Sequence, residues 1–238
     1  MKLDSAILDQ YIYGFYGYGN YQANYWFMGM EHGGVRTYEE ISLRISAWDE
    51  RGQCELEDIK EYHEAINITW WFQGPMKVQR TWGQLIRFYL AAEGLEDDLN
   101  VIQAYQVNKL GRLDGDTCLL EILPLPSPNI GDWFYSNCSK LDYLTSREDY
   151  IKTCIPLRIE HLQKRIKQYK PHVVVFYGFG YFPHWEKIAG SPFPQNHGDE
   201  FLYQKKGDTI FVVLKHPATW GITKDYFIHS GNSIRLVG

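Results

Sequence analysis

The sequence predicts an α/β protein in which helices cover both faces of a mainly four-stranded parallel sheet. Four apolar runs support this: YWFMG at 25–29, CLLEIL at 118–123, HVVVFYG at 172–178 and TIFVVLK at 209–215. Segments with helical periodicity separate them, and strands that alternate with helices form parallel sheets covered on both faces. We therefore expect a three-layer α/β/α sandwich, formed by residues 1–238 as a single domain.

The segments before the second strand contain the first helix signals. The opening YGFYGYGNYQAN, residues 13–24, has no sustained period and is expected to be a surface loop. After the first strand, VRTYEEISLRISAWDE repeats apolar residues at helical spacing. Thr37 is its expected N-cap, with Glu40 three residues later as in a capping box. The acidic stretch 55–64 is expected to continue as helix.

The second half of the chain is punctuated by glycine and proline. TWGQLIRFYLAAEG, residues 81–94, predicts a helix closed by Gly94. The second strand stops at Pro124, and a long amphipathic helix is expected over 146–169. FLYQKKGDTIFVVLKHP predicts a hairpin that turns at Gly207 and Asp208. A last helix is expected over about 225–236.

Composition limits the function classes. The net charge is −5, so the chain lacks the overall basic character of most duplex-DNA binders. Local basic runs exist, but they are more simply explained as solvated surface. They are Lys164, Arg165, Lys167 and Lys170, and Lys205 with Lys206.

Cysteine spacing and hydropathy indicate the cellular compartment. The four cysteines form no C-x-x-C pair, so neither a zinc ribbon nor another metal site is predicted. Their wide spacing indicates reduced thiols. MKLDSAILDQ lacks the apolar core of a signal peptide, and no run approaches the roughly 18 apolar residues of a membrane span. We expect a cytoplasmic protein with no membrane partner.

Polar and small residues follow each predicted strand. The four strand ends read GMEHGG, PLPSPN, GFGYF and HPATWG. In open α/β sheets, ligands bind beyond the carboxyl ends of the strands. These four segments are therefore predicted to contain the functional site.

In that order, the segments resemble the uracil-DNA glycosylase superfamily. GMEHGG is similar to the loop that follows the family's first strand, and HPAT at 216–219 to its His-Pro-Ser/Ala loop. CIPLRIEHLQKRIKQYKPHVVVFYG resembles the family's Cys-x-Pro, long helix, Lys/Arg-Pro, Val-Val-Val and Gly sequence. The resemblance covers about 25–223 and implies a uracil-DNA-glycosylase-like fold.

The chain departs from that family at several positions. Only Cys154 matches a ligand of the iron–sulfur branch, and Leu125 stands where another ligand would be, so we expect no cluster and no other cofactor. His32 replaces the usual proline of the first loop. Glu121 stands where uracil-reading members carry Asn. An insertion spans roughly 35–70.

The resemblance assigns catalysis to two residues. Glu31 would stabilise the positive charge that develops on the sugar and would orient water. His216 would donate a hydrogen bond to the departing base. The structural alternatives are that Glu31 caps a helix or pairs with a cation such as Arg36, and that His216 is merely satisfied at a strand end.

Substrate binding is assigned to residues on the same loops. Ionised Glu121 only accepts hydrogen bonds, which suits a base with amino groups, whereas a Glu121 protonated through burial would also donate. Alternatively, Glu121 pairs with a surface cation. Phe72 is the expected stacking ring, with Trp71 next and Trp220 as a wedge. The full binding set is Gly29, Met30, His32, Gly33, Phe72, Glu121, Asn129, Pro217 and Thr219.

Three functions fit this pattern. The first is a DNA glycosylase-like enzyme that hydrolyses the N-glycosidic bond of a damaged or deaminated base, in single-stranded or damaged DNA. The second is a catalytically silent domain that binds a nucleotide, a nucleic acid or a protein. The third is an N-glycosidase of free nucleosides or nucleotides, which would explain the missing basic surface. No oligomeric state is predicted.

Overall fold

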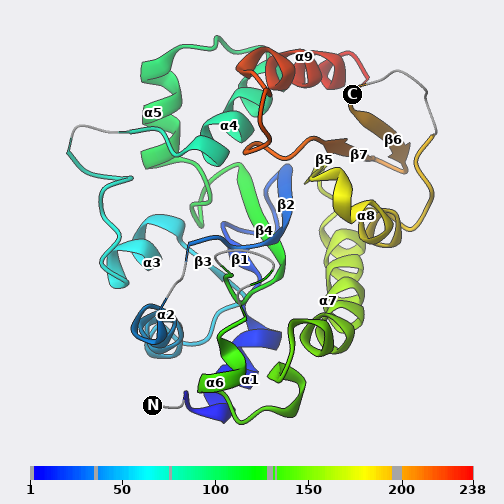
Figure 1. The fold of residues 1–238 in the computed structure, drawn as a ribbon. Coiled ribbons are helices and arrows are strands. Elements are labelled where there is room, and N and C mark those ends of the chain that lie inside the picture. The colour runs from blue at the N-terminus through cyan, green and yellow to red at the C-terminus, as the bar shows by residue number, and fades with distance from the viewer. Residues whose placement is uncertain are drawn as a thin grey trace.

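A single seven-stranded mixed sheet organises the protein. The computed structural model describes residues 3–34, 37–74, 77–127, 131, 133–194 and 200–237. The strand order is β3-β1-β4-β2-β5-β7-β6 (Figure 1). The strands are β1 Gly17–Tyr18, β2 Tyr25–Glu31, β3 Leu56–Glu57, β4 Thr117–Leu123, β5 Val173–Tyr177, β6 Leu202–Lys206 and β7 Thr209–Leu214.

The four apolar segments form adjacent strands at the centre of the sheet. β2 pairs in parallel with β4 on one side and with β5 on the other, and β5 pairs in parallel with β7. The flanking pairs are mixed, since β1–β4 and β6–β7 are antiparallel and β1–β3 is parallel. The α/β class is confirmed, and the sheet is larger than the one predicted.

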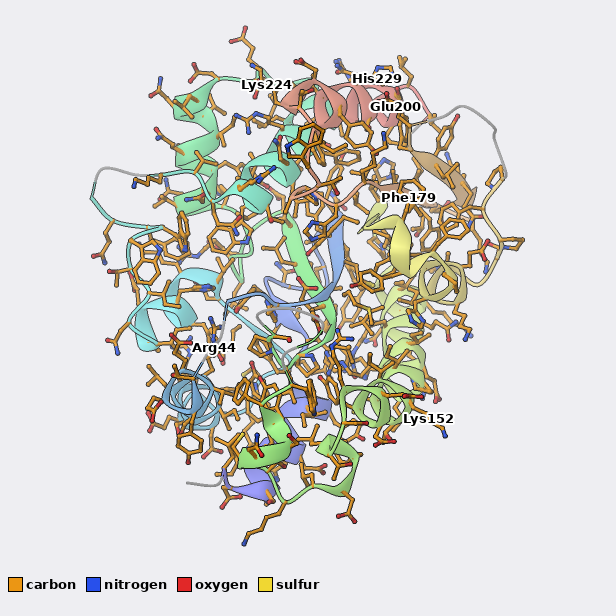
Figure 2. The ribbon with its side chains drawn as sticks, viewed as in Figure 1. Arg44, Lys152, Phe179, Glu200, Lys224 and His229 are labelled. Atoms are coloured by element: carbon orange, nitrogen blue, oxygen red, sulfur yellow. The ribbon has the colours of Figure 1, made fainter. Side chains whose placement is uncertain are left out.

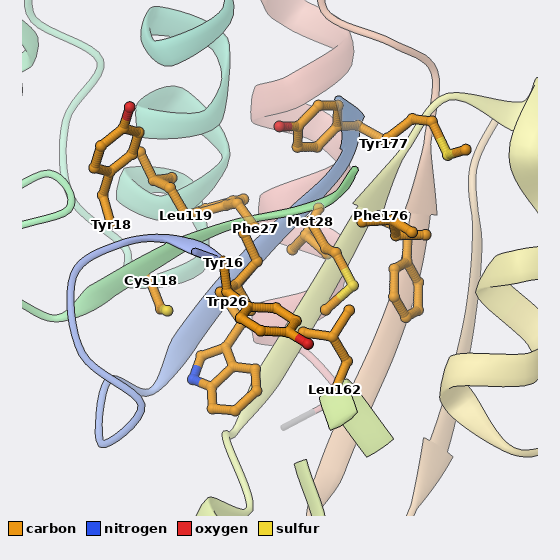
Figure 3. Close-up of a cluster of buried hydrophobic side chains, with 14 of the residues drawn as sticks. Tyr16, Tyr18, Trp26, Phe27, Met28, Cys118, Leu119, Leu162, Phe176 and Tyr177 are labelled. Carbon is orange, nitrogen blue, oxygen red and sulfur yellow. The ribbon is translucent and has the colours of Figure 1, made fainter. Parts of the chain in front are cut away.

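Helices lie on both sides of this sheet (Figure 1). They are α1 Ser5–Gly14, α2 Tyr38–Glu50, α3 Ile59–Ala65, α4 Arg80–Ala92, α5 Leu99–Asn108, α6 Tyr135–Cys138, α7 Arg147–Tyr169, α8 Phe182–Ala189 and α9 Lys224–Arg235. On one face, Phe88 of α4 contacts Phe27 of β2, with ring centroids 6.1 Å apart. On the other face, Trp26 and Met28 of β2 lie near Leu162 of α7 (Figure 3). The architecture is therefore α/β/α.

Local capping accounts for several helix boundaries. The Thr37 hydroxyl accepts a hydrogen bond from the N–H of Glu40 at 3.2 Å, as predicted. Ser146 caps α7 in the same way through the N–H of Asp149, at 3.0 Å. Gly207, with φ of 61°, lies in the β6–β7 turn that the sequence predicted.

Two local expectations were wrong. The opening segment is not all loop, because it contains the end of α1 and strand β1. The stretch 55–64 does not continue α2, because Gly52 and Gln53 adopt left-handed conformations with φ of 96° and 57°. The chain then forms β3, and Asp58 caps α3.

A buried arginine joins the first helix to the sheet and to α7. Arg158 is fully buried and donates to the carbonyl oxygens of Ile12, Phe15, Glu121 and Ile122. Its guanidinium also lies 3.8 Å from the centre of the Tyr16 ring. Backbone acceptors thus satisfy a charge that would otherwise be costly to bury.

A helix needs roughly 20 apolar residues to cross a bilayer. Within the residues described above, no helix is both long enough and apolar enough to do so.

Candidate functional site

The carboxyl ends of the central strands bring four polar side chains to one face of the sheet. Gly29 pairs with Glu121, and Glu31 pairs with Leu123, in the parallel register of β2 and β4. Alternate residues of a strand point to the same face, so Glu31 and Glu121 project on the side of Phe27 and α4. Tyr177 ends β5, and His216 follows β7 at the same edge.

Gly29 leaves the space in which Glu121 and Tyr177 meet. The Tyr177 hydroxyl donates to Glu121 Oε1 at 2.9 Å. A methyl group on Gly29 would lie 2.4 Å from Glu121 Oε2 and 2.4 Å from the Tyr177 hydroxyl. The Tyr177 ring accordingly lies across the end of β2 (Figure 3). In this structure Gly29 is required by the Glu121–Tyr177 pair.

Glu121 is half-buried, and its carboxyl group forms no ion pair with any of the described residues. Burial raises its pKa to about 8, the nearby Glu31 adds to the rise, and the Tyr177 hydrogen bond opposes it. The other oxygen, Oε2, is buried and has no hydrogen-bond partner among the residues described. At neutral pH Glu121 is therefore mostly a carboxylic acid, with Oε1 accepting from Tyr177 and Oε2 free to donate.

Glu31 has an ion partner that the sequence did not reveal. Nη2 of Arg147, the first residue of α7, lies 2.7 and 2.8 Å from the two carboxylate oxygens. Both side chains are 14% exposed. Burial raises the pKa of Glu31, and the Arg147 guanidinium opposes that rise. The pair fixes the orientation of Glu31 at the strand end.

His216 is oriented by the turn that follows it. The N–H of Ala218 donates to Nδ1 of His216 at 3.1 Å, so the neutral ring carries its proton on Nε2. Burial lowers the pKa of His216, and Arg80 lowers it further. The ring packs edge-on against Tyr177, with centroids 5.6 Å apart. His216 is therefore a neutral donor adjacent to the Glu121–Tyr177 pair.

Two other predicted residues of the first loop pack against neighbouring side chains. Met30 is 6% exposed and points to the face opposite Glu31, because neighbouring residues of a strand alternate. Its side chain is therefore excluded from the site. His32 packs against the Phe15 and Tyr18 rings, with centroids 5.9 and 5.5 Å away. Burial lowers the pKa of His32 to about 3.

The remaining predicted binding residues lie in different environments. Phe72 is 4% exposed and packs edge-on against His63. It therefore belongs to the hydrophobic core and presents no free face on which a base could stack. Pro217 is buried, whereas Gly33 and Thr219 are exposed. Asn129 lies outside the described residues. The proposed wedge, Trp220, is 96% exposed.

Tyr177 and Arg147 are site residues that sequence reasoning missed. Tyr177 is the last residue of an apolar strand, so the rule that led to His216 would have found it as well. Arg147 had no such signal, since it follows the N-cap of a long helix and meets Glu31 from 116 residues away.

Three of the basic residues noted in the sequence lie at the opposite edge of the sheet. Lys167, Lys170 and Lys206 line a cavity of about 440 Å³ near the start of β7. Lys206 is already engaged, because its amine donates to the carbonyls of Ala189 and Gly190 at 3.0 and 2.9 Å. This surface is therefore separate from the carboxyl edge that carries Glu31 and His216.

Comparisons with known proteins add no assignment. The chain matches no protein-family model and no curated protein. Within the part of the chain that the structure covers, no three His, Cys, Asp or Glu side chains are grouped so as to hold a metal ion. The chemistry of the site rests on its geometry alone.

Proposed function

We propose that this protein hydrolyses an N-glycosidic bond in a nucleotide, as a glycosylase-like enzyme. The observation that supports the proposal is the gathering of Glu31, Glu121, Tyr177 and His216 at the carboxyl edge of neighbouring parallel strands. This edge is where open α/β sheets bind ligands. The same arrangement is in keeping with the uracil-DNA-glycosylase-like fold suggested by the sequence.

In this proposal Glu31 acts on the sugar. Cleavage of the bond develops positive charge on the sugar ring, and a carboxylate beneath the ring stabilises that charge. Arg147 favours the ionised form of Glu31 against the effect of burial. The paired carboxylate is better suited to electrostatic stabilisation and to orienting water than to strong base catalysis.

His216 and Glu121 donate hydrogen bonds to the departing base in this proposal. The neutral imidazole of His216 donates from Nε2 to a base oxygen as negative charge builds there. Protonated Glu121 donates from Oε2, which restores the donor that an Asn would provide at this position. The two carboxyl groups thus take different roles, because Glu31 is paired with Arg147 whereas Glu121 forms no ion pair within the described residues.

A second candidate is the hydrolysis of free nucleotides. It is favoured by the net charge of −5 and by the position of the lysine-lined cavity, which is at the edge away from the site. A free nucleotide does not require the extended basic surface on which long nucleic acids bind.

The decisive test is a base-release assay with the purified full-length chain. Substrates are single- and double-stranded oligonucleotides with several damaged bases, and free nucleosides and nucleotides in parallel. Glu31→Gln and His216→Ala are each expected to lower turnover by about 100-fold. Matched controls are Glu200→Gln and His229→Ala: both residues are exposed, Glu200 precedes β6 and His229 lies on α9 (Figure 2).

Each outcome bears on a definite claim. Base release that is lost in both site variants and kept in both controls supports the proposal. Wild-type protein that releases no base from any substrate refutes the enzyme and leaves a binding domain. Equal turnover in all four variants would remove Glu31 and His216 from the mechanism.

A further inference from the structure

Arg44 is a cation set among aromatic rings on α2, inside the insertion. The side chain lies between α2 and α3 (Figure 2), and the hydroxyl of Tyr62 on α3 donates to the Arg44 carbonyl at 2.9 Å. Its strongest electrostatic neighbours are the phenols of Tyr18, Tyr11, Tyr62 and Tyr135. Over the described residues, Arg44 takes part in no ion pair.

The groups around Arg44 are neutral and connect it to the site. Tyr18 lies within electrostatic reach of both Arg44 and Glu121. The Tyr18 ring also contacts His32 and His63, with centroids 5.5 and 5.3 Å away. Burial lowers the pKa of His32 to about 3 and that of His63 to about 4, so neither adds positive charge at neutral pH.

Two features of this cluster indicate an anionic ligand. A partly buried guanidinium that forms no ion pair within the described residues is best satisfied by phosphate or carboxylate oxygens. Arg44 is only partly buried, and none of its nitrogens is both sealed from solvent and unpartnered. In addition, Nε2 of His32 is buried without a hydrogen-bond partner in the described structure, and it can donate in one tautomer.

We propose that Arg44, together with Tyr18 and His32, binds the phosphate group of the nucleotide whose base lies against Glu121. The inference rests on the proposed function and adds the phosphate to its substrate. β1 pairs with β4 so that Tyr18 lies opposite Leu119, two residues before Glu121 on the same face of the sheet; Tyr18 and Glu121 are therefore diagonal neighbours, about 7–8 Å apart. The insertion therefore adds a cation to this edge, beside Arg147 and Arg80.

Calorimetric titration of the full-length chain tests this directly. The probes are the 5′-monophosphates of deoxyadenosine, deoxycytidine, deoxyguanosine and deoxyuridine, the matching nucleosides, inorganic phosphate, and a single-stranded oligonucleotide. At least one monophosphate is expected to bind about 10-fold or more tightly than its nucleoside, since one charged hydrogen-bonded contact contributes on that order.

Three variants isolate the guanidinium. Arg44→Gln is expected to abolish the preference for the monophosphate, and Arg44→Lys to keep part of it, because lysine retains the charge and loses the planar fork. Lys152→Gln removes one exposed charge on α7 and is expected to keep the full preference (Figure 2). Melting temperatures report folding, and Arg44→Lys is read alone if Arg44→Gln does not fold.

The outcomes distinguish a free nucleotide from a phosphate within a strand, and they test the phosphate site separately from the proposed enzyme activity. Weaker binding of the monophosphate alone in Arg44→Gln identifies a free nucleotide, and weaker binding of the oligonucleotide as well identifies a phosphate within a strand. Equal binding of nucleoside and monophosphate to the wild type, a preference unchanged in Arg44→Gln, or no binding of any probe overturns the inference. A phosphate preference without base release would refute only the proposed enzyme.

Discussion

Gly29→Ala is expected to destabilise the protein through the Glu121–Tyr177 pair. The added methyl would lie 2.4 Å from Glu121 Oε2 and 2.4 Å from the Tyr177 hydroxyl, well inside contact distance. Gly29 does not have a positive φ, so the backbone accepts alanine and the cost comes from the side chains. Overpacking costs about 1–3 kcal/mol, and loss of the 2.9 Å hydrogen bond adds about 1 kcal/mol.

The assay is equilibrium unfolding in urea at pH 7, supported by thermal melting. A loss of about 2–4 kcal/mol corresponds to a decrease in Tm of roughly 4–16 °C for a chain of this length. Gly33→Ala is the matched control, because a methyl on Gly33 meets nothing within 4 Å. Its free energy of unfolding is expected to stay within about 0.5 kcal/mol of the wild type.

A double variant shows whether the cost arises at the pair. Tyr177→Phe removes the hydroxyl that the new methyl would meet, so the double change with Gly29→Ala should cost less than the sum of the single changes. Gly29→Ala as stable as Gly33→Ala would refute the packing argument. Strict additivity would show that the strain arises elsewhere.

Three further predictions concern charge and exposure. Glu121 has a folded pKa of about 8, against 4.5 for the free group. The contribution of Glu121 to the stability of the protein should therefore be highest below pH 4.5 and should decline as the pH rises to 8, by up to about 1.4 kcal/mol per pH unit. Glu121→Gln should remove this slope from urea midpoints measured between about pH 5 and 9. Arg147→Met should raise the pKa of Glu31 further and move the acid limb of the pH profile of base release to higher pH. If the acid limb does not move, Glu31 is not the group that titrates in it. Trp220→Ala should leave the free energy of unfolding within about 0.5 kcal/mol of the wild type, because the ring is 96% exposed, and a wedge role would appear only as weaker binding of oligonucleotides.

The central strands and several helix ends were predictable because their causes are local. Thr37 and Glu40 lie three residues apart and form their cap without help from the rest of the chain. Continuous apolar runs such as 173–177 are stable only as buried strands between two layers. The short strand β1 was not predictable in this way, since its two residues are defined by partners on β3 and β4.

The candidate site was predictable at its strand ends and not at its supporting groups. Glu31 ends β2, Glu121 lies two residues before the end of β4 and His216 follows β7, so the edge of the sheet at which they gather could be inferred from sequence. Arg147 and Arg44 come from a helix terminus and from the insertion, and their approach depends on tertiary packing. The protonation of Glu121 likewise depends on burial, which sequence position alone does not give.

The contacts of Arg158 have a consequence for synthesis of the chain. This residue bonds to Ile12 and Phe15 across 146 and 143 positions, and to Ile122 across 36. During synthesis α1 leaves the ribosome long before α7, so its hydrogen bonds to Arg158 cannot form until α7 has been made. Contacts between residues so far apart in sequence also form slowly. The amino-terminal segment should therefore be a late-docking part of the nascent chain, and a chain truncated before Arg158 should leave it susceptible to proteases.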